Sequence, residues 1–60
     1  MIIRYFETGK KGDVYQIIKI GRTSTPWNVY VYDYSYRVYH IYKGSFKSLK
    51  SACEYIHTSL

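Results

Sequence analysis

The residues from Trp27 to Tyr42 alternate between branched apolar and aromatic side chains. Valine and tyrosine alternate up to an Asp-Tyr-Ser break at residues 33–35, and the alternation resumes after it. A period of two residues is typical of a β-strand whose two faces differ. This stretch therefore predicts a hairpin with strands over residues 27–33 and 36–42.

The register of this hairpin decides which side chains share a face. A loop with an even number of residues predicts three facing pairs: Val31 with Val38, Tyr32 with Arg37, and Tyr30 with Tyr39. One face would then carry the valines, and the other would carry the tyrosines and the arginine. A sheet face that shows tyrosine and arginine to solvent is typical of a contact surface.

Two more strands are expected before this hairpin, over residues 2–7 and 14–20. The six residues between them include two glycines, which favour a turn. Residues 21–26 are turn formers ended by a proline, which predicts a loop. Residues 43–45, Lys-Gly-Ser, are expected to break the sheet after the fourth strand.

The end of the chain has the pattern of an amphipathic helix over residues 48–58. Ser48 is a candidate N-cap, because its hydroxyl can accept a hydrogen bond from an amide of the first turn. Apolar residues then recur at helical spacing and form one stripe: Leu49, Ala52, Cys53, Ile56 and Leu60. The sheet is the available partner for this stripe. The expected fold is α+β, a three- or four-stranded antiparallel meander with one C-terminal helix packed on its valine face.

The aromatic residues that flank these elements have expected structural roles. Trp27 shares the parity of Val29 and Val31, which places it at the boundary between sheet and helix. Phe46 precedes the helix and is expected to seal the edge of the core.

The length of 60 residues predicts one domain over residues 1–60. A chain this short buries only about 60% of its unfolded surface, and an enclosed catalytic pocket takes roughly 300 Å³ or more. We therefore expect no enzymatic activity and no cofactor. The one cysteine excludes an intramolecular disulfide, and no apolar run approaches the roughly 20 residues that cross a bilayer. No secretory signal is recognisable at the N-terminus, so a cytoplasmic protein is expected.

The charge indicates the chemistry of a partner. Nine lysines and arginines against four acids give a net charge of +5. That excess favours an anionic partner, such as nucleic acid or an acidic protein surface, although positive charge can also serve solubility alone.

The candidate binding residues combine an aromatic platform with basic residues. Bases stack on tyrosine rings and arginine planes while lysines follow phosphates. The predicted platform consists of Tyr30, Tyr32, Arg37 and Tyr39. The predicted phosphate partners are Lys10, Lys11, Arg22, Lys43, Lys47 and Lys50. The alternatives are a face that is solvated or that is covered by a second copy in a homodimer.

The stretch from Trp27 to Ile56 resembles the arm-type DNA-binding domains at the N-terminus of tyrosine-recombinase integrases, and the ethylene-response-type domains of plants. The residues that carry the resemblance are Trp27, Val29, Val31, Arg37, Phe46, Ser48 and Ala52. In those families three strands precede a helix, and the sheet enters the major groove of DNA. The resemblance implies DNA binding and a phage or mobile-element context. This chain departs from the families in its Asp-Tyr-Ser hairpin tip and in having one arginine in the hairpin.

Two functional hypotheses follow. The first is binding of nucleic acid, DNA above all, through the aromatic and basic sheet face. The second is a protein-binding inhibitor or adaptor, such as a phage antagonist of a host enzyme or defence complex, that uses the same tyrosines and arginine. A metal site is not expected, because Cys53 belongs to the apolar stripe and Cys53 with His57 supplies only two ligands.

Overall fold

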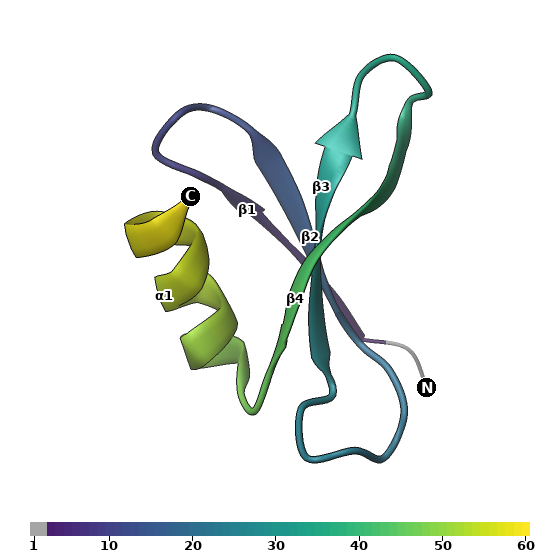
Figure 1. Cartoon of the computed structure of the whole chain (residues 1–60), viewed down its shortest axis with the longest axis vertical. Coiled ribbons are helices and arrows are strands. Elements are labelled where there is room, and N and C mark those ends of the chain that lie inside the picture. The colour runs from purple at the N-terminus through teal and green to yellow at the C-terminus, as the bar shows by residue number, and fades with distance from the viewer. Residues whose placement is uncertain (1–2) are drawn as a thin grey trace.

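The computed structural model describes residues 3–60, which form four strands and one helix (Figure 1). Their bounds are β1 Ile3–Thr8, β2 Val14–Lys19, β3 Trp27–Asp33, β4 Val38–Phe46 and α1 Leu49–Ser59. The strands pair in the order β1-β2-β3-β4, each antiparallel to the next. The predicted α+β fold, an antiparallel meander followed by one helix, is confirmed.

The predicted boundaries agree with the structure for β3 and differ most for β4. β4 runs to Phe46, whereas the predicted strand ends at residue 42. The prediction that residues 43–45 break the sheet is wrong, because Gly44 lies opposite Val29 and Ser45 opposite Asn28. Gly44 directly follows a register shift of β4, and glycine inside a strand often marks such an irregularity. Residue 2, the start of the predicted first strand, lies outside the described residues.

The predicted pairing of β3 with β4 also needs correction. Asp33 pairs with Val38, so the turn contains the four residues 34–37. The observed partners are therefore Tyr32 with Tyr39, Val31 with Ile41, and Tyr30 with Tyr42. The loop does hold an even number of residues, but it is two residues longer than the predicted pairs require.

Two register shifts in the same hairpin change which residues of β4 share a face. They lie between Tyr32 and Val31 and between Tyr30 and Val29, and they leave His40 and Lys43 as the extra residues of β4. Each extra residue reverses the alternation that follows it. Tyr39 and Tyr42, which strict alternation would place on opposite faces, consequently lie on the same face.

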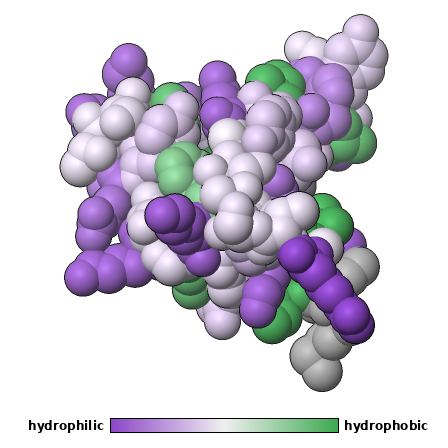
Figure 2. Space-filling model, turned by 60° about the horizontal axis from the view of Figure 1, so that its bottom comes forward, coloured by the Kyte–Doolittle hydropathy of each residue, from purple (hydrophilic) through white to green (hydrophobic). Residues whose placement is uncertain are grey.

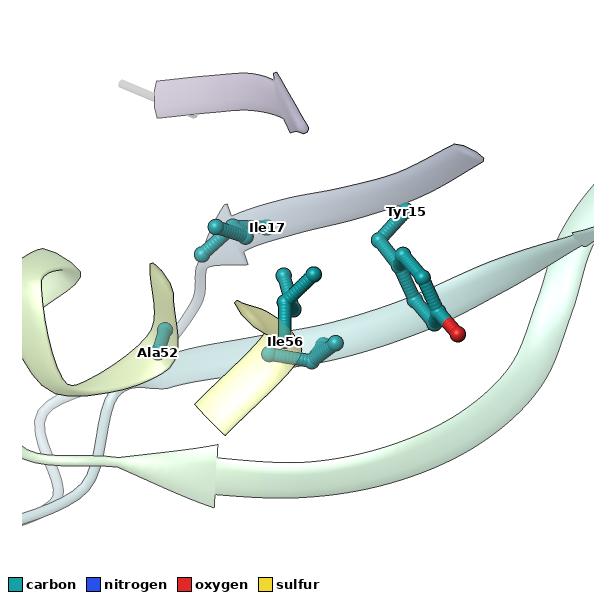
Figure 3. Close-up of a cluster of buried hydrophobic side chains, with 5 residues drawn as sticks. Tyr15, Ile17, Ala52 and Ile56 are labelled. Carbon is teal, nitrogen blue, oxygen red and sulfur yellow. The ribbon is translucent and has the colours of Figure 1, made fainter. Parts of the chain in front are cut away.

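The core lies between the sheet and α1. Its buried residues come from β2, β3 and the helix: Tyr15, Ile17, Val29, Ala52 and Ile56. Figure 3 shows the helix residues facing the sheet, with the hydroxyl of Tyr15 pointing away from the isoleucines. The remaining residues of the predicted stripe, Leu49, Cys53 and Leu60, are half-buried against this cluster. The predicted apolar stripe and the partner that it covers are both confirmed.

The ends of the helix are held as local chemistry requires. Ser48 is the N-cap, and its hydroxyl accepts a hydrogen bond of 3.1 Å from the amide of Ser51. Near the other end, His57 Nε2 lies 3.2 Å from Glu7 Oε2 of β1. The apolar stripe packs α1 on one side of the sheet, and within residues 3–60 no helix covers the other side (Figure 1).

The aromatic residues at the boundary between sheet and helix occupy their predicted places. Trp27 is half-buried, packs on the core, and lies 6.0 Å from the ring of Tyr5. Phe46 packs on the core and lies 4.8 Å from the ring of Tyr55 of α1. Within residues 3–60, α1 is too short to cross a membrane.

Candidate binding surface

The side of the sheet opposite to α1 is the candidate binding surface, called here the open face. Because facing residues in neighbouring strands point to the same side, the register assigns its members. They are Arg4, Phe6, Thr8, Val14, Gln16, Ile18, Asn28, Tyr30, Tyr32, Tyr39, Tyr42 and Ser45.

Aromatic rings gather on this face in two groups, which together are called here the aromatic cluster. It consists of Phe6, Tyr30, Tyr32, Tyr34, Tyr39 and Tyr42. The ring of Tyr32 lies 4.9 Å from that of Tyr39 and 4.8 Å from that of Tyr34 in the turn. The rings of Tyr30 and Tyr42 form a separate pair at 5.6 Å. These distances and the tilted or edge-on angles are those of favourable aromatic pairs.

The aromatic cluster closes over the middle of the open face. Phe6 of β1 and Tyr39 of β4 stand on opposite edges of the sheet, yet their ring centroids are 5.5 Å apart. Neighbouring strands lie about 4.8 Å apart, so three such spacings separate β1 from β4 in a flat sheet. The two rings can meet only if the sheet bends or if the side chains lean over β2 and β3. Ile18, in the middle of this face, is only 6% exposed. The open face therefore buries an apolar side chain of its own, apart from the core beside α1.

A chain of hydrogen bonds occupies the polar end of the open face. The hydroxyl of Ser45 donates to Asn28 Oδ1, which leaves the hydroxyl of Tyr42 to donate to Ser45 Oγ. The amide nitrogen of Asn28 donates to the carbonyl oxygen of Pro26 at 3.1 Å. Both ends of the Asn28 side chain are thus engaged within the protein.

Among residues 3–60, the open face itself carries no acidic residue. The acids lie elsewhere: Glu7 on the helix side, Asp13 and Asp33 beside turns, and Glu54 on α1. Within residues 3–60, Arg4 is the charged member of the open face. In Figure 2, which views one side of the molecule, strongly hydrophilic side chains stand at the margins around a pale centre, and hydrophobic patches are small and separate.

The predicted platform is assembled in part. Tyr30, Tyr32 and Tyr39 lie together on the open face, as the alternation indicates. Arg37 does not face Tyr32: it is the last residue of the turn and is exposed, with φ at 57°. The longer turn takes this arginine out of the strand.

The predicted phosphate partners are exposed and spread around the periphery. Lys10 and Lys11 lie in the β1–β2 turn and Arg22 in the β2–β3 loop, and these two segments are at opposite ends of the molecule (Figure 1). Lys43 is an extra residue of β4, Lys47 precedes the helix, and Lys50 belongs to α1. These six residues do not form one basic patch.

Four aromatic or charged residues of the surface are absent from the sequence-based set: Arg4, Phe6, Tyr34 and Tyr42. The pairing of β1 with β2 places Arg4 and Phe6 on the open face. The sequence of β1 does not reveal this, because each of its two faces carries an aromatic residue. The position of Tyr42 depends on the extra residue in β4, for which the sequence has no clear signal. Tyr34 reaches the cluster from the turn.

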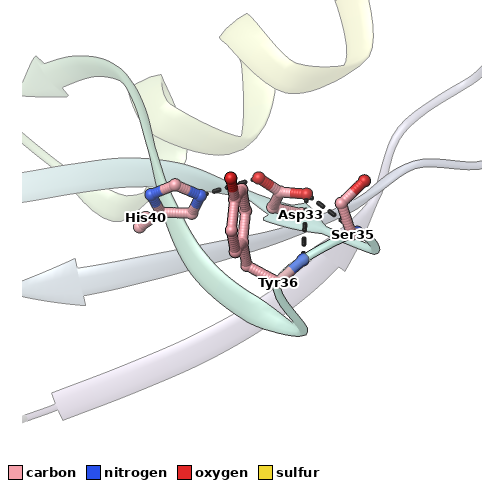
Figure 4. Close-up of polar contacts among 4 residues, drawn as sticks. All are labelled: Asp33, Ser35, Tyr36 and His40. Atoms are coloured by element: carbon pink, nitrogen blue, oxygen red, sulfur yellow. Dashed lines mark hydrogen bonds and ion pairs between the residues drawn. The ribbon is translucent and has the colours of Figure 1, made fainter.

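The β3–β4 turn is ordered by one carboxylate (Figure 4). Asp33 Oδ1 accepts hydrogen bonds from the amides of Ser35, at 2.9 Å, and Tyr36, at 3.4 Å. Asp33 Oδ2 lies 2.7 Å from His40 Nε2, and the ring of Tyr36 lies 5.7 Å from that of His40. The hydrogen bond with His40, followed by those from the two amides, lowers the pKa of Asp33.

We expect this carboxylate to give the protein an acid-dependent stability. The folded state lowers the pKa of Asp33 from its ordinary value of 3.8, so the unfolded state binds the proton at higher pH. The stabilisation is present above about pH 4 and is lost as the pH falls through the lowered pKa. Urea unfolding between pH 2 and 6 should show a shallower acid decline for Asp33→Asn than for the wild type.

The matched control for this experiment is Asp13→Asn in the other hairpin turn. Within residues 3–60, the side chain of Asp13 makes none of the hydrogen bonds found for Asp33, so this variant should keep the wild-type acid decline. Equal changes in both variants would contradict the role given to Asp33.

Other chemistry is sparse in the described part of the chain. Residues 3–60 hold no detectable pocket and no group of three or more potential metal ligands among histidine, cysteine and acidic residues. Cys53 is half-buried, and its burial raises the pKa of the thiol, with Glu7 adding to the effect. His57 of the same helix contacts Glu7.

Comparison with models of protein families, with curated proteins and with solved structures found no match. The resemblance to the arm-type domains thus rests on its quoted residues and on a shared order of elements, an antiparallel sheet followed by a helix.

Proposed function

We propose that this chain is a non-enzymatic module that binds nucleic acid through its open face. The observation that carries the proposal is the aromatic cluster, exposed on a face without an acidic residue in a chain of charge +5. Aromatic rings stack on bases, and a positive field raises the local concentration of a polyanion. The phage or mobile-element context and the cytoplasmic location belong to the same proposal.

The test is a fluorescence-anisotropy titration of labelled DNA and RNA at low and at physiological salt. We expect binding that weakens as salt rises, because contacted phosphates release counterions. Arg4→Ala, on the open face, should weaken binding more than Lys50→Ala on α1, which removes a charge of the same sign from the other side. No binding at low salt, or equal effects of the two variants, would contradict the proposal.

A second candidate function is a protein-binding inhibitor or adaptor, including a phage antagonist of a host enzyme or defence complex. The observation that favours it is the β3–β4 turn, where Tyr36 is 74% exposed beside Arg37 and the backbone is ordered by Asp33. Tyrosine and arginine in a preorganised segment are typical of interface hot spots. The test is a pull-down from host lysate treated with nuclease. We expect the wild-type protein to retain a host protein, Tyr36→Ala to lose it, and Phe6→Ala to retain it as the wild type does.

A further inference from the structure

We infer that the open face binds single-stranded nucleic acid, DNA or RNA, in preference to duplex, with Phe6, Tyr34 and Tyr42 as its stacking rings. This inference rests on the proposed function and specifies its ligand. It differs from what the resemblance implies, which is a sheet inserted in the major groove of a duplex.

Each of these three rings is exposed and contacts the ring of a less exposed tyrosine. Phe6, Tyr34 and Tyr42 are 58%, 64% and 54% exposed. Phe6 contacts the ring of Tyr39, Tyr34 that of Tyr32, and Tyr42 that of Tyr30. Each of these three partners is half-buried. A contact with a neighbouring ring restricts the motion of the exposed ring before a ligand arrives, so stacking a base on it costs less entropy.

The polar groups of the open face are poorly suited to reading a duplex. A protein reads base pairs in the major groove through the edges of the bases, mainly with arginine, lysine, asparagine and glutamine. Asn28 has both ends of its side chain engaged with Ser45 and Pro26. Gln16 is half-buried, which leaves Arg4 as the exposed reader on this face within residues 3–60.

The aromatic groups, in contrast, need a ligand whose bases are free to stack. In a duplex the faces of the bases are covered by their neighbours, whereas a single strand can splay them onto aromatic side chains. Phe6 and Tyr39 meet across the sheet, and Phe6, Tyr34 and Tyr42 remain exposed, so the open face offers several aromatic rings to a single strand.

A cationic residue accompanies each stacking ring in the sequence. Arg4 is two residues from Phe6 on the same face of β1, Arg37 is three residues from Tyr34, and Lys43 adjoins Tyr42. All three cations are exposed, and the ion pairs within residues 3–60 involve only His40 and His57. Arg4, the charged member of the open face, is therefore available to phosphates that flank a stacked base, and Arg37 and Lys43 are free of these ion pairs.

The experiment compares a labelled ten-nucleotide single strand, as DNA and as RNA, with the duplex of the same sequence at physiological salt. We expect the single strand to bind at least about tenfold more tightly than the duplex. Tyr34→Leu should weaken single-strand binding by about fivefold or more, because leucine keeps apolar bulk but offers no ring to a base. Circular dichroism would show that each variant is folded.

The matched control is Tyr36→Leu, which changes an exposed tyrosine of the same turn. Its ring lies against His40 and outside the aromatic cluster, so we expect less than a twofold effect. Equal losses in the two variants would overturn the stacking assignment. Duplex binding as tight as single-strand binding would overturn this inference and leave the proposed function in place, whereas no binding of either at low salt would overturn both.

Discussion

Replacing Ile17 with alanine is expected to remove a large share of the protein's stability. Ile17 has no exposed surface and lies in the core cluster between β2 and α1 (Figure 3). Truncation of a buried isoleucine costs about 2–5 kcal/mol, because the lost transfer energy is joined by the cost of a cavity. A domain of this size has a total stability of only about 3–9 kcal/mol. Urea unfolding followed by far-ultraviolet circular dichroism would measure the loss.

Ile20→Ala is the matched control, since it removes the same atoms just beyond the end of β2. Ile20 is 50% exposed, and its backbone amide donates to Pro26 whichever side chain is present. The free energy of unfolding should change by less than about 0.5 kcal/mol. A loss in Ile20→Ala as large as that in Ile17→Ala would show that the core is not where the structure places it.

Replacing Gly9 with alanine is expected to destabilise the fold by about 1–3 kcal/mol, the usual range for overpacking. A Cβ at this position would lie 2.8 Å from Cε2 of Tyr15, a contact that requires movement. Tyr15 is only 5% exposed and packs among the core residues, so its ring cannot move away without a cost. The backbone of Gly9 does not adopt a positive φ, so the effect should come from the ring alone.

A double-mutant cycle with Tyr15→Leu separates this clash from other effects of the substitution. Leucine has no atom at the position of Cε2, so Gly9→Ala should cost clearly less in the Tyr15→Leu background than in the wild type. The free energies of unfolding of the four proteins, from urea titrations, give the coupling. The same cost in both backgrounds would show that Tyr15 is not the obstacle.

The local patterns of the sequence predict most of the architecture. The strand over residues 27–33, the N-cap at Ser48 and the apolar stripe of the helix all agree with the structure. These features follow from a side-chain period of 2.0 or 3.6 residues and from the hydrogen-bonding capacity of a serine, which are properties of neighbours in the chain.

These local patterns do not predict the register of the second hairpin, β3 with β4. The four-residue turn depends on how Asp33 accepts from two amides and on the contact of its second oxygen with His40. The extra residues His40 and Lys43 then reverse the alternation twice within β4. A bulge is chosen by the fit of whole strands, so a local period does not reveal it.

The sequence by itself determined the order of the elements, the helix that covers one face, and a tyrosine-rich sheet in a basic chain. Only the tertiary structure decided which aromatic residues meet. It removed Arg37 from the predicted platform, brought Tyr42 onto the open face, and joined Phe6 to Tyr39 across the whole sheet. The physical reason is that periodicity specifies the face of each strand locally, whereas bulges, twist and contacts between edge strands act on residues far apart in the chain.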